Sequence, residues 1–212
     1  MDISPLFGLR LRTPRLELRL PTHEELVELR ELARAGIHPR EEMPFAIAWT
    51  DEPYSEEWVV AFHEQQREAW RPDAWDLELG VWANGELAGV QGLFAKDVAE
   101  SRAVGTGSWL GQRFQSRALG TEMRTAVLEL AFRGLGAEFA RSGAVEGNAA
   151  SLRVSEKLGY RVVGSGRVSP RGVEVAHKHT DVELRREDWR PPFAVEIEGL
   201  GNCLPLFGGA PA

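Results

Sequence analysis

Residues 108–123 read SWLGQRFQSRALGTEM, and this stretch decides the fold. A strand pattern runs into a turn of small and polar residues, which opens directly into an amphipathic helix whose apolar positions recur every three to four residues up to Phe132. The first amides of a helix have no partner within it and lie at its positive end. The turn therefore predicts a binding site for an anion.

A second informative stretch, residues 148–160, reads NAASLRVSEKLGY. Asn148 is suited to cap a helix at its N-terminus, and Gly159 is suited to end it. A strand pattern precedes this stretch as well. The sequence therefore predicts a second strand-to-helix connection that begins at a polar amide side chain.

The two stretches resemble motifs A and B of the GCN5-related N-acetyltransferase (GNAT) superfamily, and they occur in the family's order. Motif A is a Gln/Arg-x-x-Gly-x-Gly/Ala loop that cradles the pyrophosphate of coenzyme A. Gln115 takes its first position, Ala118 stands where Gly is usual, and Gly120 takes the last position. In motif B an Asn opens a helix beside the pantetheine, and the helix ends in Leu-Gly-Phe/Tyr. The resemblance implies that the chain binds a coenzyme A thioester.

Hydrophobic periodicity along the whole chain predicts one α/β (α+β) domain with a mixed, mostly antiparallel seven-stranded sheet flanked by helices. The resemblance adds that the fourth and fifth strands splay apart and leave a wedge for the cofactor. We expect residues 1–190 to form the acyltransferase domain and residues 191–212 to form a C-terminal extension that packs on the domain or on a neighbouring subunit. The predicted strands are 15–20, 76–82, 87–94, 103–110, 137–144, 160–168 and 173–184, and the predicted helices are 22–36, 55–70, 117–132 and 149–158.

Length and composition exclude several classes of protein. A chain of 212 residues can bury a core without staples, and its single cysteine, Cys203, cannot form an intramolecular disulfide. No apolar run approaches the roughly 18 residues of a membrane span. The net charge of −7 disfavours nucleic acid, although Arg102–Arg171 contains eleven Lys and Arg against five Asp and Glu, which suits a phosphate-bearing cofactor. We therefore expect a cytoplasmic protein with no nucleic-acid and no membrane partner.

Finer features resemble the RimJ/RimL-type branch, which acylates N-termini of ribosomal proteins among other amines, and further resemble a mycobacterial member that binds succinyl-CoA. The resemblance implies an N-acyltransferase that moves an acetyl or succinyl group from coenzyme A to a primary amine by direct attack in a ternary complex. The co-substrate would be acetyl-CoA or succinyl-CoA, and no metal would be needed. The acceptor would be a protein N-terminus, a lysine or a small amine. The protein would form a homodimer or a larger homo-oligomer. A catalytically inactive acyl-CoA-binding sensor or scaffold of the same fold is the alternative. The branch resemblance rests on residues 13–16, 109–110, 121–124 and 186–189, and the succinyl resemblance on 43–45, 49–50 and 205–208.

The resemblance also assigns backbone groups to the cofactor. Main-chain groups at the end of the fourth strand would contact the pantetheine and the thioester oxygen, where one well-placed donor is worth about 3–4 kcal/mol. Amides of the following loop would hold the diphosphate, and the methyl group of Ala118 would either fit helical backbone angles or push the diphosphate outward. The implied cofactor-binding residues are Trp109, Leu110, Gly111, Gln115, Ser116, Arg117, Ala118, Leu119, Gly120, Thr121, Asn148 and Ser151.

The candidate catalytic residues are Ser155, Leu110 and Glu78. Many family members place a Tyr seven residues after the motif B Asn to protonate the thiolate, and that position is Ser155 here. The alternative for Ser155 is an ordinary helix serine that bonds back to its own helix. Glu78, or Asp76 on the same strand, is a candidate base for the amine. We expect His177 and His179 to lie on an exposed strand face, where either histidine is a further candidate base. We also expect Cys203 to be a non-nucleophilic residue of the tail and Tyr160 to pack in the core.

Overall fold

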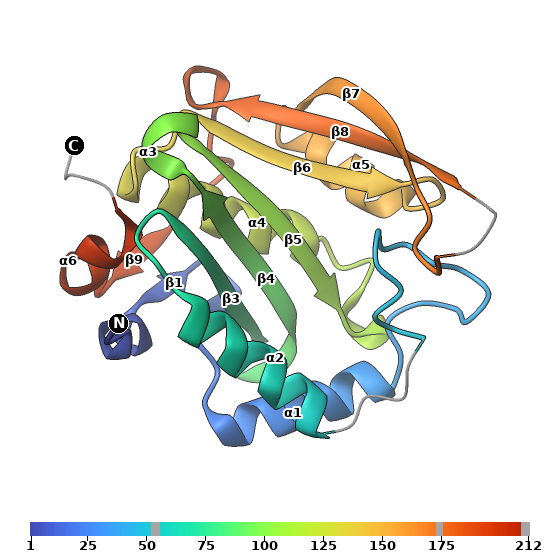
Figure 1. Cartoon of the computed structure of the whole chain (residues 1–212), viewed down its shortest axis with the longest axis horizontal. Helices are drawn as coiled ribbons and strands as arrows, with labels where there is room; N and C mark the ends of the chain where they lie inside the picture. The colour runs from blue at the N-terminus through green and yellow to red at the C-terminus, as the bar shows by residue number, and fades with distance from the viewer. Residues whose placement is uncertain (52–55, 173–175, 209–212) are drawn as a thin grey trace.

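The computed structural model describes residues 1–51, 56–172 and 176–208, which are arranged around a single mixed sheet (Figure 1). The strand order is β7-β8-β6-β5-β4-β3-β2-β1-β9, and among the described residues only β5 and β6 pair in parallel. The strands are β1 (Arg10–Arg12), β2 (Leu16–Arg19), β3 (Ala74–Ala83), β4 (Glu86–Lys96), β5 (Ala103–Leu110), β6 (Phe139–Val145), β7 (Arg161–Val168), β8 (His177–Arg185) and β9 (Glu196–Glu198).

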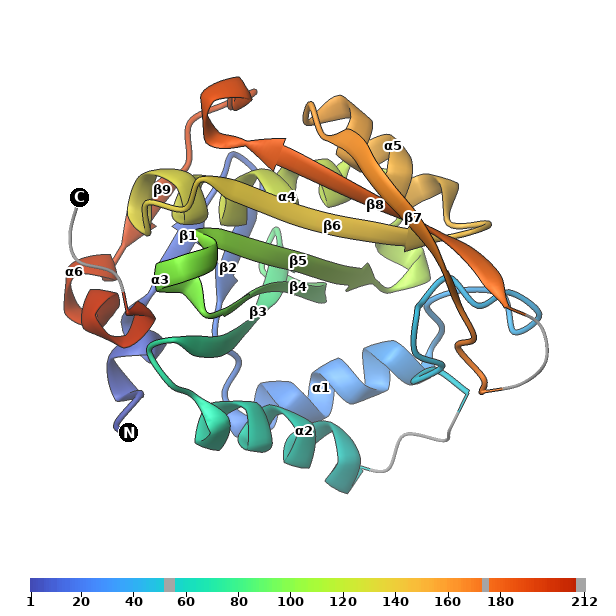
Figure 2. The ribbon, with the colours of Figure 1, turned by 45° about the horizontal axis from the view of Figure 1, so that its top comes forward.

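Helices cover both faces of this sheet (Figure 2). α1 (His23–Arg34) and α2 (Glu56–Ala69) pack on one face against β4 and β3, whereas α4 (Leu119–Glu129) and α5 (Ala149–Lys157) pack on the other. The main hydrophobic core lies between the sheet and α4. The remaining helical pieces are α3 (Val98–Ser101), α6 (Leu200–Cys203), a π-helical turn at Leu130–Gly134, and 3₁₀ turns at Ser4–Gly8, Gln112–Phe114, Arg186–Asp188 and Leu204–Phe207.

The sheet opens between β5 and β6. Their parallel pairing covers only three residue pairs, from Ala103–Phe139 to Gly105–Arg141. Beyond that point β5 continues alongside β4 as far as Leu110, and β6 continues alongside β8. The two strands diverge visibly toward the end of β5 (Figure 1). The predicted splay between the fourth and fifth strands is therefore confirmed, and we call the opening the wedge.

The predicted fold class is confirmed, with a sheet of nine described strands in place of seven. The two additional strands, β1 and β9, pair with each other at one edge, and each has three residues. A strand of that length is too short to show a period, so the sequence does not reveal β1. β9 is the short strand expected from the sequence among the last twenty residues. The strand predicted from residue 173 begins at His177, and residues 173–175 lie outside the described residues, as does Ser55 at the predicted start of α2.

Local sequence signals explain where several elements begin. Thr22 caps α1, and Glu25 completes a capping box, as its spacing predicts. Asn84 and Gly85 both have positive φ, 52° and 82°, which is the primed turn expected between β3 and β4. These signals are local, so they could be read without knowledge of the tertiary structure.

The described part of the C-terminal segment packs on the rest of the molecule. β9 pairs with β1, and the Phe207 ring lies 5.5 Å from that of Trp70 and 4.9 Å from that of Trp75. Cys203 is buried, and burial raises the pKa of its thiol to about 11, so it stays protonated and non-nucleophilic near neutral pH. Among the described residues, no helix has the length and apolar character that a membrane crossing requires.

Candidate functional site

The loop between β5 and α4 concentrates unpaired backbone donors. α4 begins directly after Ala118, and no described side chain caps its N-terminus. The first amides of the helix, from Leu119 to Thr121, are therefore free to bind an anion at the positive helix end. The Arg117 guanidinium lies 6.0 Å from the Phe114 ring and adds positive charge to the loop. This arrangement supports the predicted anion site.

Ala118 adopts a left-handed conformation, with φ 62° and ψ 10°. Of the two alternatives for its methyl group, the fit to ordinary right-handed helical angles is therefore excluded, and the outward displacement of the diphosphate stays a prediction. Ser116 is also left-handed, with φ 60°, so the loop folds back twice within three residues. Successive left- and right-handed residues turn their amides into a common concavity that suits an anion. The loop thus keeps the geometry of a glycine motif at the cost of backbone strain at Ala118.

Two residues of the predicted cofactor-binding set hold the loop in place instead. Gln115 Nε2 donates to the carbonyl oxygens of Ile37, at 2.7 Å, and Leu110, at 2.8 Å. The Gly111 amide donates to the Ala88 carbonyl oxygen at 3.0 Å. Both donors are thus occupied within the protein. The Gln115 amide, which was predicted to hold the diphosphate, donates to the Gln112 carbonyl oxygen at 3.1 Å, so neither this amide nor that of Gly111 is free for the cofactor contact predicted for it.

The Leu110 amide faces the wedge. The Gly111–Ala88 pair of the antiparallel β4–β5 ladder is hydrogen-bonded, so the preceding pair, Leu110–Gly89, is of the other kind. The Leu110 amide therefore points away from β4 and toward β6. Pairing with β6 has already ended at Gly105, so no β6 acceptor meets this amide. Leu110 can donate to a group bound in the wedge, as its predicted role requires.

The backbone of Trp109 is directed the other way, toward β4. By the same alternation its backbone bonds to β4, so the main-chain contact predicted for it is not available. Its indole ring lies 5.8 Å from that of Trp49, which in turn lies 5.0 Å from the Phe45 ring. Trp109 therefore anchors residues 37–51, an irregular segment that we call the strap.

The strap bonds to both sides of the wedge: Gln115, after β5, binds Ile37, and two further bonds come from the side of β6 and β8. On the α5 side, Asn148 Nδ2 donates to the Pro44 carbonyl oxygen at 3.0 Å. At the β7–β8 turn, Arg171 Nη2 donates to Asp51 Oδ1 at 2.9 Å. The strap therefore lies beside the open end of β5 in the fold (Figure 1). The sequence showed only aromatic residues without a period there, so the bridging role was missed.

Asn148 is the N-cap of α5, as predicted. Its Oδ1 accepts the Ser151 amide at 3.1 Å, while its Nδ2 holds Pro44. Both polar atoms of the side chain therefore have protein partners, and one amide hydrogen is left for a ligand. Ser151 contributes its backbone to the cap. These two predicted cofactor-binding residues therefore lie where the strap meets α5.

Ser155 is buried, and it joins α5 to α4. Its Oγ donates to the Ser151 carbonyl oxygen at 3.1 Å, the bond of an ordinary helix serine, and accepts from Arg124 Nη1 at 3.0 Å. The contact with Arg124 was not predicted. A charged residue on the apolar stripe of α4 was the available signal. Tyr160 is buried as expected, and burial raises the pKa of its phenol while the Arg124 charge opposes that shift.

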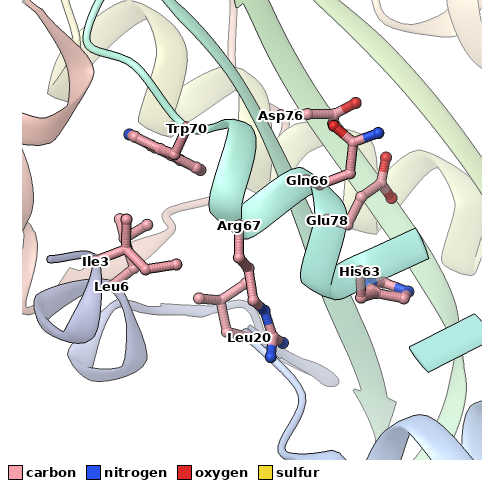
Figure 3. Close-up of a pocket in the computed structure, with 9 residues that line it drawn as sticks. All are labelled: Ile3, Leu6, Leu20, His63, Gln66, Arg67, Trp70, Asp76 and Glu78. Atoms are coloured by element: carbon pink, nitrogen blue, oxygen red, sulfur yellow. The ribbon is translucent and has the colours of Figure 1, made fainter. Parts of the chain in front are cut away.

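Two half-buried carboxyl groups lie on the opposite face of the sheet. Asp76 and Glu78 project from β3 beneath α2, where Gln66 and His63 line the same small cavity (Figure 3). Burial raises the pKa of Glu78 well above its usual range, and the charge and hydrogen bond of Asp76 raise it further. Burial also raises the pKa of Asp76. A carboxyl pair of this kind retains a proton at a pH where an exposed pair would lose both.

The Glu78 carboxyl group extends across the sheet toward β5. Glu78 pairs with Gly92, where an added Cβ would lie 2.6 Å from Glu78 Oε1, so the glycine makes room for the carboxyl group. Gly92 pairs with Gly107, an exposed residue two positions beyond the last parallel pair. Neighbouring strands lie about 4.8 Å apart. The carboxyl group is therefore roughly one strand spacing from the point where the wedge opens.

Metal ligands are not gathered at this site. Within residues 1–51, 56–172 and 176–208 there is no group of three His, Cys, Asp or Glu side chains that could hold a metal ion. His179, one of the two histidines considered from the sequence, has its Nδ1 3.0 Å from Asp181 Oδ1 on the same strand. The groups described at the site are hydrogen-bond donors, a buried guanidinium and two carboxyl groups.

Comparison with known proteins gives a family and a fold. Residues 15–161 match the model of the acetyltransferase (GNAT) domain family. Among solved structures, RimL, a ribosomal L7/L12 alpha-N-protein acetyltransferase in complex with coenzyme A, has a TM-score of 0.68 at 16% identity, with 83% of this chain and 97% of that chain covered.

Two further structures have the same fold. A putative ribosomal-protein-serine acetyltransferase from Vibrio cholerae has a TM-score of 0.65 at 20% identity, covering 83% of this chain and 97% of that one. Microcin C7 self immunity acetyltransferase MccE, in complex with acetyl-CoA and AMP, has a TM-score of 0.65 at 17% identity, covering 82% and 93%. Because the family model spans more than half of the chain, the chain belongs to the GNAT acetyltransferase family.

Proposed function

We propose that the protein is an acyl-CoA-dependent N-acyltransferase whose cofactor enters the wedge between β5 and β6. The observation that carries this proposal is the Leu110 amide, which points into the wedge next to the uncapped N-terminus of α4. The helix terminus offers amides to a diphosphate, and Leu110 offers one to a thioester oxygen farther along. This pairing of an anion site with an isolated donor suits a long phosphorylated thioester.

The proposed reaction uses groups on both faces of the sheet. The Glu78–Asp76 pair accepts a proton from the incoming ammonium group, which approaches over the exposed Gly107. The neutral amine attacks the thioester carbon, and Leu110 donates its amide hydrogen bond to the developing oxyanion. The carbon–sulfur bond then breaks, its electron pair leaves with the sulfur, and the nitrogen releases its second proton to water, from which the thiolate is protonated. No covalent enzyme intermediate is needed, which fits the protonated Cys203.

The donor and acceptor are the finer part of the proposal. The donor is acetyl-CoA or succinyl-CoA, and the acceptor is a protein N-terminus, a lysine or a small amine. Two of the similar structures are described as acetyltransferases of ribosomal proteins, which favours a protein N-terminus as the first acceptor to test. We propose a cytoplasmic homodimer or larger assembly in which residues 1–190 form the acyltransferase domain and residues 191–212 extend it.

The test combines binding with turnover. Calorimetric titrations with acetyl-CoA and succinyl-CoA are followed by thiol release in the presence of peptides with free N-termini and of small amines. We expect binding, and transfer that Glu78→Gln slows roughly 100-fold with unchanged thioester affinity. Glu68→Gln, an exposed residue of α2, is the matched control and keeps full activity. Binding without transfer to any amine would establish the sensor or scaffold instead, and failure to bind either thioester would refute the proposal.

A further inference from the structure

Arg124 is a buried cation without a carboxylate partner. It is 3% exposed, and no Asp or Glu of the described residues lies within ion-pair distance. The other two buried charges of α4 differ in this respect: Glu122 binds Arg15, and Glu129 binds Arg133 and the Trp189 indole. A buried charge normally needs a partner of opposite sign, because its removal from water costs on the order of several kcal/mol. The missing counter-charge of Arg124 therefore calls for an explanation.

The contacts of Arg124 place it behind the wedge. Nη1 donates to Ser155 Oγ on α5 at 3.0 Å, and Nη2 lies 3.5 Å from Ser108 Oγ on β5. Nε is buried and has no partner among the described atoms. The side chain thus connects α5 with β5, one of the two strands that flank the wedge. The remaining ionisable group that faces it is Tyr160, a neutral phenol near pH 7 whose pKa burial raises.

We propose that Arg124 is a positioning residue for the leaving thiolate of coenzyme A, acting through the Ser155 hydroxyl and through its own uncompensated charge. This inference rests on the proposed function, because it requires a thioester in the wedge. The counter-charge missing from the resting protein would then be the sulfur anion that forms when the carbon–sulfur bond breaks. Such an arrangement stabilises a charge that exists only late in the reaction.

The chemistry follows from the donor and acceptor roles at Ser155. Arg124 donates to the Ser155 oxygen, which leaves the hydroxyl hydrogen as the group that Ser155 can direct elsewhere. In the resting protein that hydrogen goes to the Ser151 carbonyl oxygen. When the carbon–sulfur bond breaks, the hydroxyl hydrogen turns toward the thiolate and donates a hydrogen bond, and the neutralising proton is the one that the former amine nitrogen loses, which water carries to the sulfur. Ser155 therefore stays protonated throughout, and the guanidinium polarises its hydroxyl.

The experiment measures the pKa of the coenzyme A thiol when bound, from the ultraviolet absorbance of the thiolate, alongside steady-state kinetics. We expect the bound thiol to have a lower pKa in the natural protein than in free coenzyme A. Arg124→Met should raise it by roughly one unit or more and lower kcat roughly 10- to 100-fold, with KM for the thioester nearly unchanged. Arg124→Lys, which keeps the charge, should restore most of both quantities. Arg161→Met, at an exposed arginine of β7, is the control and changes neither.

The outcomes separate this inference from the proposed function. If the natural protein fails to bind coenzyme A or to transfer an acyl group, the proposed function fails. If it does both, and folded Arg124→Met keeps the natural thiol pKa and kcat, Arg124 is only structural. Should Arg124→Met not fold, Ser155→Ala carries the test, because it removes the hydroxyl and leaves the guanidinium. An unchanged thiol pKa and kcat in Ser155→Ala would overturn the proposal.

Discussion

Ser116 and Ala118 hold left-handed backbone angles in the loop before α4, where glycine would be unstrained. A side chain with a Cβ costs about 1–2 kcal/mol in this region of backbone space. The strain directs the loop amides into one concavity, so it serves the anion site and not the core. Sequence comparison with the family motif identified Ala118 as a departure, but only the backbone angles show that the departure carries a cost.

We therefore expect Ala118→Gly to stabilise the protein. Relief of the left-handed strain outweighs the greater flexibility of glycine in the unfolded chain, so the free energy of unfolding should rise by about 1 kcal/mol. Affinity for coenzyme A should stay the same or increase, because the loop keeps its shape. Urea unfolding and calorimetry measure the two quantities. Gly166→Ala, at an exposed glycine of β7 where an added Cβ would meet nothing within 4 Å, is the control outside the loop and should leave the affinity unchanged. A less stable Ala118→Gly protein would contradict the argument.

α4 is the element that organises the site, and its buried charges hold it in place. Glu122 accepts hydrogen bonds from Thr13 Oγ1, at 2.6 Å, and from the Arg15 backbone and side chain, at 2.9 and 2.6 Å. Glu129 accepts from Trp189 Nε1 at 2.6 Å near the other end of the helix. Both partners come from segments far away in the chain. α4 is thereby tied to the connection between β1 and β2 and to the segment after β8, with Arg124 between the two anchors.

Glu122→Ala should cost about 3 kcal/mol of unfolding free energy or more. The substitution leaves the donors of Thr13 and Arg15 without their acceptor and opens space beneath α4. Chemical denaturation at neutral pH measures the loss. Glu156→Ala, an exposed residue of α5, should change stability by less than about 0.5 kcal/mol. A loss of the same small size in Glu122→Ala would show that the buried carboxylate adds little.

Sequence patterns predicted the features that are built from neighbouring residues, such as helix caps and the anion loop. They did not reveal the contacts between residues that are far apart in the chain. The cap of α1 at Thr22, the cap of α5 at Asn148 and the anion loop were all readable, because each is built within a few residues. Segments 13–16 and 121–124 were recognised as typical of one family branch, but their mutual contact was not, because Thr13 and Glu122 are 109 positions apart. Arg124 was missed for the same reason.

At the scale of the whole molecule, both faces of the sheet contain buried ionisable groups. Arg124 lies on the α4 face, whereas Glu78, Asp76 and His63 lie beneath α2 on the other face. The wedge is the place where the sheet opens between its two faces. Composition gave the charge of each half of the chain but not which charges are buried, because burial is decided by the packing of helices on the sheet. The buried groups consequently make stability depend on pH in a way that the sequence does not predict.

His63 and Glu78 should shape the pH profile of stability in opposite ways. Burial lowers the pKa of His63 from 6.5 to about 4. Between these pH values the unfolded chain therefore binds a proton at His63, and the folded protein does not. Stability contributed by neutral His63 therefore rises from pH 4 to pH 6.5, by roughly 3 kcal/mol in total. Glu78 has a raised pKa, so above its ordinary value the unfolded chain releases a proton that the folded protein retains, and stability falls as pH rises.

Two variants separate these contributions. Unfolding free energies measured from pH 4 to pH 9 should show a rise and then a decline in the natural protein. His63→Gln should flatten the rise in unfolding free energy, because the buried imidazole that binds a proton only in the unfolded chain is removed. Glu78→Gln should flatten the decline and become the more stable protein at pH 9, because no buried carboxyl group must ionise there. If Glu78→Gln instead loses as much stability at pH 9 as the natural protein does, the Glu78 carboxyl group is not the source of the decline. That result would also rule out the proposed base, because the amine is proposed to give its proton to a Glu78–Asp76 pair with a raised pKa.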